Sequence, residues 1–191
     1  MASRVTITKD KVNAVVGSIT KLVGKQVLVG IPEANGSRQD PEESAPVTNA
    51  ALGYIHEFGS PRANIPARPF LIPGVRKSTA RVMPHLRGAC AAALDGKPDV
   101  ADKELVAAGL IAESSAKREI STGDFIPLKP ETVAWRFLQR NTKTRRPNEE
   151  RYLKLIDEGA SPADAQALAG IRPLINTGQL RNSLTSVVRK K

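Results

Sequence analysis

The pair His56-Glu57 comes nearest, among the residues of this chain, to a catalytic arrangement. A histidine beside a carboxylate could supply a general base, or it could begin an H-E-x-x-H zinc site. That motif needs a second histidine one helical turn later, and Gly59 and Ser60 stand in the relevant places, while His85 is 29 residues away. The partial motif therefore favours a simpler role, in which His56 and Glu57 brace the loop that follows a helix, over a metal site or a hydrolase centre.

The elements that must position this pair are an apolar helix before it and a proline-rich segment after it. Apolar residues recur at helical spacing over residues 47–58, and Gly59 stands where a helix commonly ends. Residues 60–70 then contain three prolines, which fix φ and restrict the residues before them to extended conformations. We predict a stiff, extended arm that presents Arg62, Arg68 and Phe70 at defined places, which is more typical of a docking element than of an enzyme site.

Motifs for phosphate loops, dinucleotide binding and serine hydrolysis are absent from the sequence. The single cysteine, Cys90, excludes an internal disulfide and a cysteine-based zinc site. Because it lies in an alanine-rich run, we expect it to be a small buried thiol. The sequence thus predicts a protein that is not an enzyme, with no metal and no cofactor.

Length and composition bound the protein further. A chain of 191 residues suits one domain, or one domain with an appended subdomain, and the low share of aromatic residues (4%) predicts an aliphatic core. No signal peptide or membrane-spanning run is evident, so we expect a soluble protein made in the cytoplasm. The net charge of +10 favours contact with a polyanion, although acidic and basic stretches alternate, which suits a self-complementary surface equally well.

Hydrophobic periodicity predicts helices over 9–23, 75–94 and 100–120, a strand over 26–31, a surface loop over 33–46 and a terminal strand over 183–189. We expect Met83 and Cys90 on the apolar face of the second helix, with Pro84 marking a kink or a later start, and Val106 and Leu110 on that of the third. The fold class is α+β: a small, mostly antiparallel sheet with packed helices, formed by residues 1–129 and 173–191. Residues 130–172 form a helical insertion subdomain.

A basic run near the insertion offers a second class of function. Its cations could contact phosphates, and Trp135 and Phe137 upstream could stack on single-stranded bases. The simpler explanation is that the aromatic residues pack the subdomain and that the charges are solvated. The candidate DNA contacts are Arg140, Lys143, Arg145 and Arg146.

Two stretches together resemble a known family. The segments IHEFG and IPARPF within residues 55–70, and PLINTGQLRNS over residues 173–183, resemble tailed-bacteriophage neck and tail-completion proteins, also labelled virion morphogenesis or head–tail joining proteins. The order of elements matches over residues 5–126 and 173–189, whereas the stretch 130–172 is longer than the family pattern. The resemblance implies an α+β virion structural protein that forms or completes the head–tail junction, or terminates the tail.

The resemblance also implies partners and a location. Such subunits form a ring, a hexamer or a dodecamer, beside connector, neck and tail-tube proteins, in the virion neck after assembly in the host cytoplasm. Some of the surplus positive charge would face channel DNA, and no membrane is involved. The arm would supply the subunit interface through Arg62, Pro66, Arg68, Pro69 and Phe70. On this hypothesis, Arg68→Glu blocks assembly and leaves the subunit folded.

Overall fold

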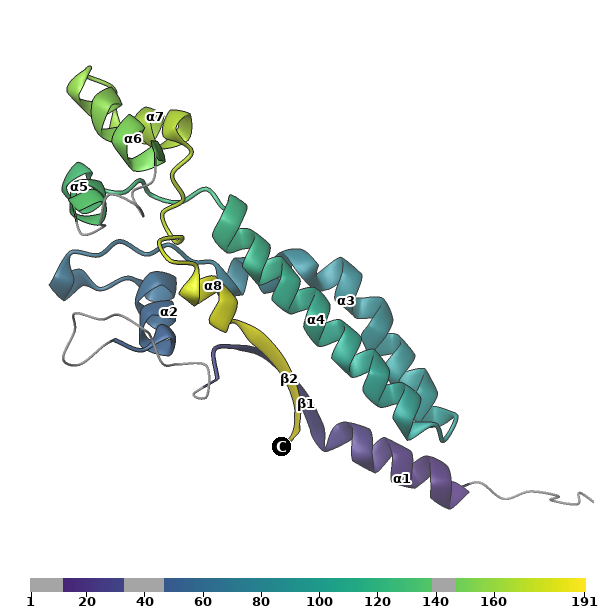
Figure 1. Cartoon of the computed structure of the whole chain (residues 1–191). Coiled ribbons are helices and arrows are strands. Elements are labelled where there is room, and N and C mark those ends of the chain that lie inside the picture. Colours follow the sequence, from purple (N-terminus) through teal and green to yellow (C-terminus); the bar gives the residue numbers. More distant parts are fainter. Residues whose placement is uncertain (1–11, 33–46, 139–146) are drawn as a thin grey trace, which may run out of the picture. The chain divides into compact units, whose positions relative to one another are not determined.

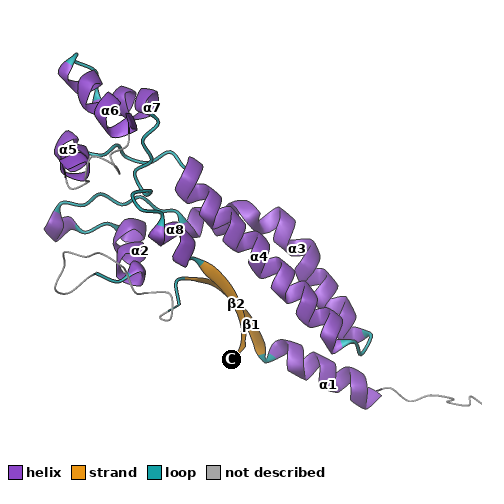
Figure 2. Cartoon of the chain, viewed as in Figure 1, coloured by secondary structure: helices purple, strands orange, loops and turns teal. Residues whose placement is uncertain are grey.

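The computed structural model describes residues 12–32, 47–138 and 147–191 (Figures 1 and 2). The loop predicted over 33–46 and the start of the first predicted helix lie outside these ranges. The described chain is α+β, as predicted, with eight α-helices and a two-stranded antiparallel sheet. It forms two compact units, described separately below. Unit 1 comprises residues 1–30, 74–115 and 185–191, and unit 2 comprises residues 31–73 and 116–184.

Unit 1 contains the sheet, which joins the two ends of the chain. Strand β1 (Lys25–Gly30) pairs with β2 (Thr185–Lys190), in a register that sets Lys25 opposite Lys190 and Gly30 opposite Thr185. Helix α1 (Val12–Val23) precedes β1 and ends at Gly24, as predicted. The two terminal runs contain β-branched residues, which favour strands, and their pairing satisfies backbone groups of both strands.

Two long helices complete unit 1. They are α3 (Leu71–Leu94), which enters the unit at Gly74, and α4 (Pro98–Thr122), which leaves it after Ser115. Small residues dominate their shared core, which consists of Ala89, Ala92, Ala93, Ala101 and Leu105, with Leu22, Val27, Leu86 and Val188 packed against it. Gly109 lies so close to the sheet that an added Cβ would meet Val27 Cγ1 and Ser186 Cβ at 3.1 Å. Small side chains thus let α4 approach the strands closely.

Polar contacts fix β2 and β1 to α4. The Glu113 carboxylate accepts hydrogen bonds from the backbone N–H and the hydroxyl of Ser186, at 2.8 and 2.9 Å. Lys25 of β1 forms an ion pair with Asp102. Because Glu113 accepts a hydrogen bond from the backbone of β2, it fixes the position of this strand along α4.

Several predicted core residues of unit 1 are in fact exposed. Cys90 is exposed, and Met83 is 39% exposed. The buried face of the helix is formed instead by Ala89, Ala92 and Ala93. Cys90 lies about 100° around the helix from Ala89 and so points away from this face. Helix α3 also runs without interruption through Pro84 and begins at Leu71, four residues earlier than predicted.

The predicted stripe on α4 needs the same correction. Val106 and Leu110 are 47% and 53% exposed. The buried face of α4 instead follows Ala101, Leu105, Ala108 and Ala112, which recur at i+4, i+3 and i+4. Alanine is a weaker apolar signal than valine or leucine, so the sequence pattern placed Val106 and Leu110 wrongly. The later members of the predicted stripe, Ala116 and Ile120, are buried, at 0% and 1% exposure.

Unit 2 contains α2 (Asn49–Phe58), a 3₁₀ helix (Pro61–Ala63) and the short α8 (Gln179–Ser183). It also contains α5 (Pro130–Leu138), α6 (Pro147–Asp157) and α7 (Pro162–Ala169), which occupy the stretch predicted as a helical insertion. Ser161 accepts from the N–H of Asp164 at 3.2 Å, and Gly170 ends α7 in the left-handed conformation.

A cluster of buried residues holds α5, α6 and α7 together: Leu128, Val133, Tyr152, Ala165 and Ala169. Tyr152 is completely buried, and its hydroxyl donates to the backbone carbonyl of Leu128 at 3.1 Å. Burial raises the pKa of the Tyr152 phenol above its ordinary value, and the charge of Glu131 adds to the effect. No helix in the described ranges is long and apolar enough to cross a membrane.

Candidate interaction surface

The carboxylate of Glu57 joins the end of α2 to the start of α3. Glu57 is only 7% exposed. Its Oε2 accepts hydrogen bonds from the backbone N–H groups of Phe70 and Leu71, both at 2.8 Å, and its Oε1 accepts from Ile72 at 2.9 Å. The first N–H groups of a helix have no partner inside the helix. A carboxylate there accepts their hydrogen bonds, and its negative charge interacts favourably with the helix dipole. This contact confirms the predicted bracing role for Glu57.

The arm between these helices is tied back on itself. Gly59 adopts φ 77°, and its N–H donates to Ile55 O at 2.7 Å. Ser60 and Ile65 then form an isolated antiparallel bridge around the 3₁₀ turn, with Asn64 in the left-handed conformation at φ 52°. The prediction of a wholly extended arm was therefore wrong for residues 60–65, because a turn closes within this part of it.

Arg68 anchors the second half of the arm from the inside. It is 6% exposed, its Nε donates to Ile126 O at 2.8 Å, and its Nη2 donates to Pro127 O at 3.1 Å. Its backbone N–H donates to His56 O at 2.6 Å. Burial lowers the pKa of the guanidinium, although an arginine keeps its charge at any ordinary pH. Arg68 thus contacts its own chain at both its side chain and its backbone.

The five residues predicted at a subunit interface therefore differ in exposure. Arg62 and Pro69 are exposed and Pro66 is half-buried, whereas Arg68 and Phe70 are buried, Phe70 to 1% exposure. The interface itself stays a prediction. The expectation that Arg68→Glu leaves the subunit folded needs correction, because the substitution would place a carboxylate against two carbonyl oxygens in a buried site.

The exposure of two aromatic residues on α2 was not predicted. Tyr54 and Phe58 are 66% and 58% exposed, and their ring centroids lie 4.8 Å apart. The sequence pattern placed both in the apolar stripe of this helix, and their i, i+4 spacing does put them on one face. In the structure, Gly53 occupies the inward side, where an added Cβ would meet Ile31 Cδ1 at 2.9 Å and the Phe70 ring at 3.8 Å.

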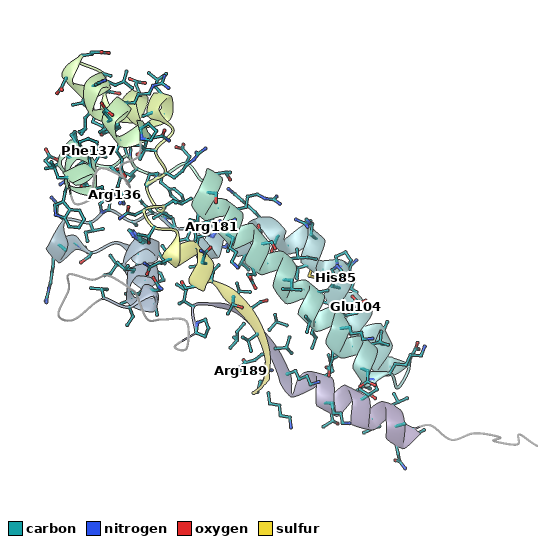
Figure 3. The ribbon with its side chains drawn as sticks, viewed as in Figure 1. His85, Glu104, Arg136, Phe137, Arg181 and Arg189 are labelled. Carbon is teal, nitrogen blue, oxygen red and sulfur yellow. The ribbon has the colours of Figure 1, made fainter. Side chains whose placement is uncertain are left out.

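The other predicted chemical groups do not gather at one place. His85 Nδ1 lies 2.7 Å from Glu104 Oε2, so this histidine pairs across α3 and α4 within unit 1 (Figure 3). Among the residues that the structure describes, no group of three or more His, Cys, Asp or Glu side chains could hold a metal ion. Both oxygens of Glu57 accept from backbone donors, so its carboxylate has a structural use.

The predicted nucleic-acid elements are only partly described. Arg140, Lys143, Arg145 and Arg146 lie outside the described residues. Upstream of them, Trp135 on α5 is 56% exposed and Phe137 is half-buried. Arg136, between these two residues, donates from Nη2 to Pro173 O at 3.1 Å, which ties α5 to the segment after α7 (Figure 3). The expectation that Trp135 packs the subdomain was therefore wrong.

Comparison with protein-family models, curated proteins and solved structures gave no match for this chain.

Proposed function

We propose that this chain is a virion structural protein that forms or completes the head–tail junction of a tailed phage, as a ring subunit of the neck, tail-completion or tail-terminator type. The observation that carries the proposal is the exposed pair Tyr54 and Phe58, which stands next in sequence to an arm fixed by Glu57 and Arg68. Large aromatic residues and arginine are the preferred anchors of protein–protein interfaces. The resemblance of residues 55–70 and 173–183 to head–tail proteins supplies the biological setting.

The contacts of the arm support a docking role on energetic grounds. A segment already held by Glu57, Arg68 and the Ser60–Ile65 bridge loses little further conformational entropy when it meets a neighbour. Arg62 on the 3₁₀ turn and Pro69 are exposed and available for such contact. In this proposal Arg68 and Phe70 position the arm, and Tyr54, Phe58 and Arg62 contact the neighbouring subunit.

The test is imaging of particles made when the gene is deleted from its parent phage, by negative-stain electron microscopy. Separate full heads and finished tails place the protein at the joint, whereas tails of uncontrolled length make it a tail terminator. Complementation with the double variant Tyr54→Ala, Phe58→Ala should leave the defect in place. The matched control Val106→Ala, Leu110→Ala removes two exposed apolar side chains from α4 and should restore infectivity. Normal particles from the deletion would overturn the proposal.

An alternative function is favoured by a different observation, the exposure of Trp135. A basic nucleic-acid-binding protein could stack bases on this indole and contact phosphates through the run Arg140 to Arg146. Since Trp135 is the single tryptophan of the chain, its fluorescence reports on stacking directly. Quenching by a single-stranded oligonucleotide that disappears when the four basic residues are neutralised would support this alternative. Unchanged fluorescence at saturating oligonucleotide would exclude it.

A further inference from the structure

One face of α3 is basic and exposed. Arg76, Lys77, Arg81 and Arg87 all have exposed side chains. At 100° per residue, the four lie within an arc of about 140° on one side of the helix. The buried residues of α3 in unit 1 lie on the other side: Gly74, Ser78, Ala89, Ala92 and Ala93. Packing of this second side therefore fixes the basic face toward solvent.

Negative charge is missing from this helix. None of the 24 residues of α3 is an Asp or a Glu. Within the described part of the chain, Arg76, Arg81 and Arg87 have no ion-pair partner. Glu104 of α4, which lies against Gly88 of α3, is already paired with His85 at 2.7 Å. The positive charges of Arg76, Arg81 and Arg87 are therefore not neutralised by an ion pair within the described ranges.

The surplus charge of the whole chain is concentrated in the same unit. Unit 1 carries fourteen Lys and Arg against six Asp and Glu, a net charge of +8, whereas unit 2 carries fifteen against thirteen, a net charge of +2. Most of the +10 of the chain thus belongs to the unit that holds the basic face. A net positive charge of this size attracts a polyanion and raises its rate of association.

The residues between the cations indicate what kind of polyanion fits. Ala80, Pro84 and Ala91 lie within the same arc and are exposed. Because these side chains are small, a ligand can approach the helix closely between the charged residues. The helix contains no Asn or Gln that would read adenine and no Phe, Tyr or Trp that would stack on a base, and its cations fit the phosphates that all sequences share. Arg76 and Arg87 are eleven residues apart, which is about 16 Å along the helix, a length that spans several phosphates of a duplex.

We propose that this face of α3 binds the phosphate backbone of double-stranded DNA without sequence selectivity, through Arg76, Lys77, Arg81 and Arg87. The proposal uses other residues than the run Arg140 to Arg146 and the α2 pair Tyr54 and Phe58, and it does not depend on the head–tail proposal. Because the contacts are to phosphates, binding releases counterions and weakens linearly in log salt.

The test is fluorescence anisotropy of the full chain with a labelled duplex of roughly 30 base pairs and random sequence, between about 50 and 200 mM salt. The triple variant Arg76→Gln, Arg81→Gln, Arg87→Gln should bind at least tenfold more weakly at the lowest salt. Its slope of log affinity against log salt should fall by about 2.7, since each phosphate contact contributes about 0.9. Circular dichroism checks that the variant is folded.

The matched control is Lys103→Gln, Arg118→Gln, Arg151→Gln, which removes the same total charge from exposed positions on α4 and α6. It should keep the wild-type slope and lose no more than about twofold in affinity. The proposal is overturned if the control loses as much as the α3 variant, since net charge alone would then explain binding. It is also overturned if the wild-type chain does not bind the duplex at the lowest salt.

Discussion

Glu57 Oε2 lies 2.8 Å from the backbone nitrogen of Phe70, thirteen residues later in the chain, and this hydrogen bond closes the arm into a loop. The backbone of Arg68 makes a second closure by donating to His56 O at 2.6 Å. His56 and Glu57, which precede the last residue of α2, thus hold the arm where it leads into α3. Since both closures are made within the chain, the arm has its shape before any partner arrives.

The first prediction concerns this brace. Glu57→Gln replaces one acceptor oxygen by an amide that points donors at backbone N–H groups, so the free energy of unfolding should fall by about 1–3 kcal/mol. Urea unfolding followed by circular dichroism measures the loss. Glu150→Gln is the control, since it removes only an exposed i, i+4 pair with Lys154 at 3.6 Å and should cost under about 0.5 kcal/mol. Equal losses in the two variants would contradict the bracing role.

The second prediction concerns the glycine at which the arm begins. Gly59 has φ 77°, and an added Cβ would lie 3.0 Å from Ala67 N and from Ile65 O. Gly59→Ala should therefore combine backbone strain with a clash and destabilise the protein by about 2–4 kcal/mol. Gly159→Ala isolates the strain, since Gly159 has φ 89° but nothing within 4 Å of an added Cβ. Thermal unfolding of both variants tests the ranking, and a Gly159→Ala loss as large as that of Gly59→Ala would refute it.

The third prediction is a pH dependence at Tyr152. The pKa of Tyr152 is raised in the folded protein, so the folded chain holds this proton more tightly than the unfolded chain. The contribution of the neutral phenol to the free energy of unfolding is complete below the unfolded pKa of about 10. It is lost as pH rises through the folded pKa. Tyr152→Phe lacks the ionising group but also lacks the hydrogen bond to Leu128 O, which costs about 1 kcal/mol at neutral pH.

The difference in stability between wild type and Tyr152→Phe should consequently shrink as pH is raised above about 10. Urea midpoints measured for both proteins at neutral and strongly alkaline pH give this difference. A difference that is the same at both pH values would show that Tyr152 ionises equally in the folded and unfolded chains.

The fourth prediction concerns Cys90. Because its side chain is exposed on α3, the thiol should react completely with a thiol reagent such as dithionitrobenzoate in the absence of denaturant. Cys90 is the single cysteine, so Cys90→Ser gives the blank. Reaction that begins only when urea unfolds the protein would instead mean that the alanine-rich face of α3 covers the thiol.

Sequence reasoning was reliable where local chemistry decides the structure. Gly59 ends α2, and the helix before Gly24 was predicted from its periodicity. In the candidate interaction surface, the bracing role of Glu57 was predicted, but its three partners were not, because they lie thirteen to fifteen residues away. An apolar stripe also cannot say which of its members a neighbouring element covers, so the exposure of Tyr54 and Phe58 was not predicted.

The sequence by itself determined the α+β class and the ends of α1 and α2, since periodicity, caps and glycines act within a few residues. Only the tertiary structure decided that β1 pairs with β2, that alanines and not Val106 or Cys90 face the core of unit 1, and that Arg68 points inward. These outcomes depend on contacts between residues far apart in the chain. Their free energies come from burial and hydrogen bonding that no local pattern encodes.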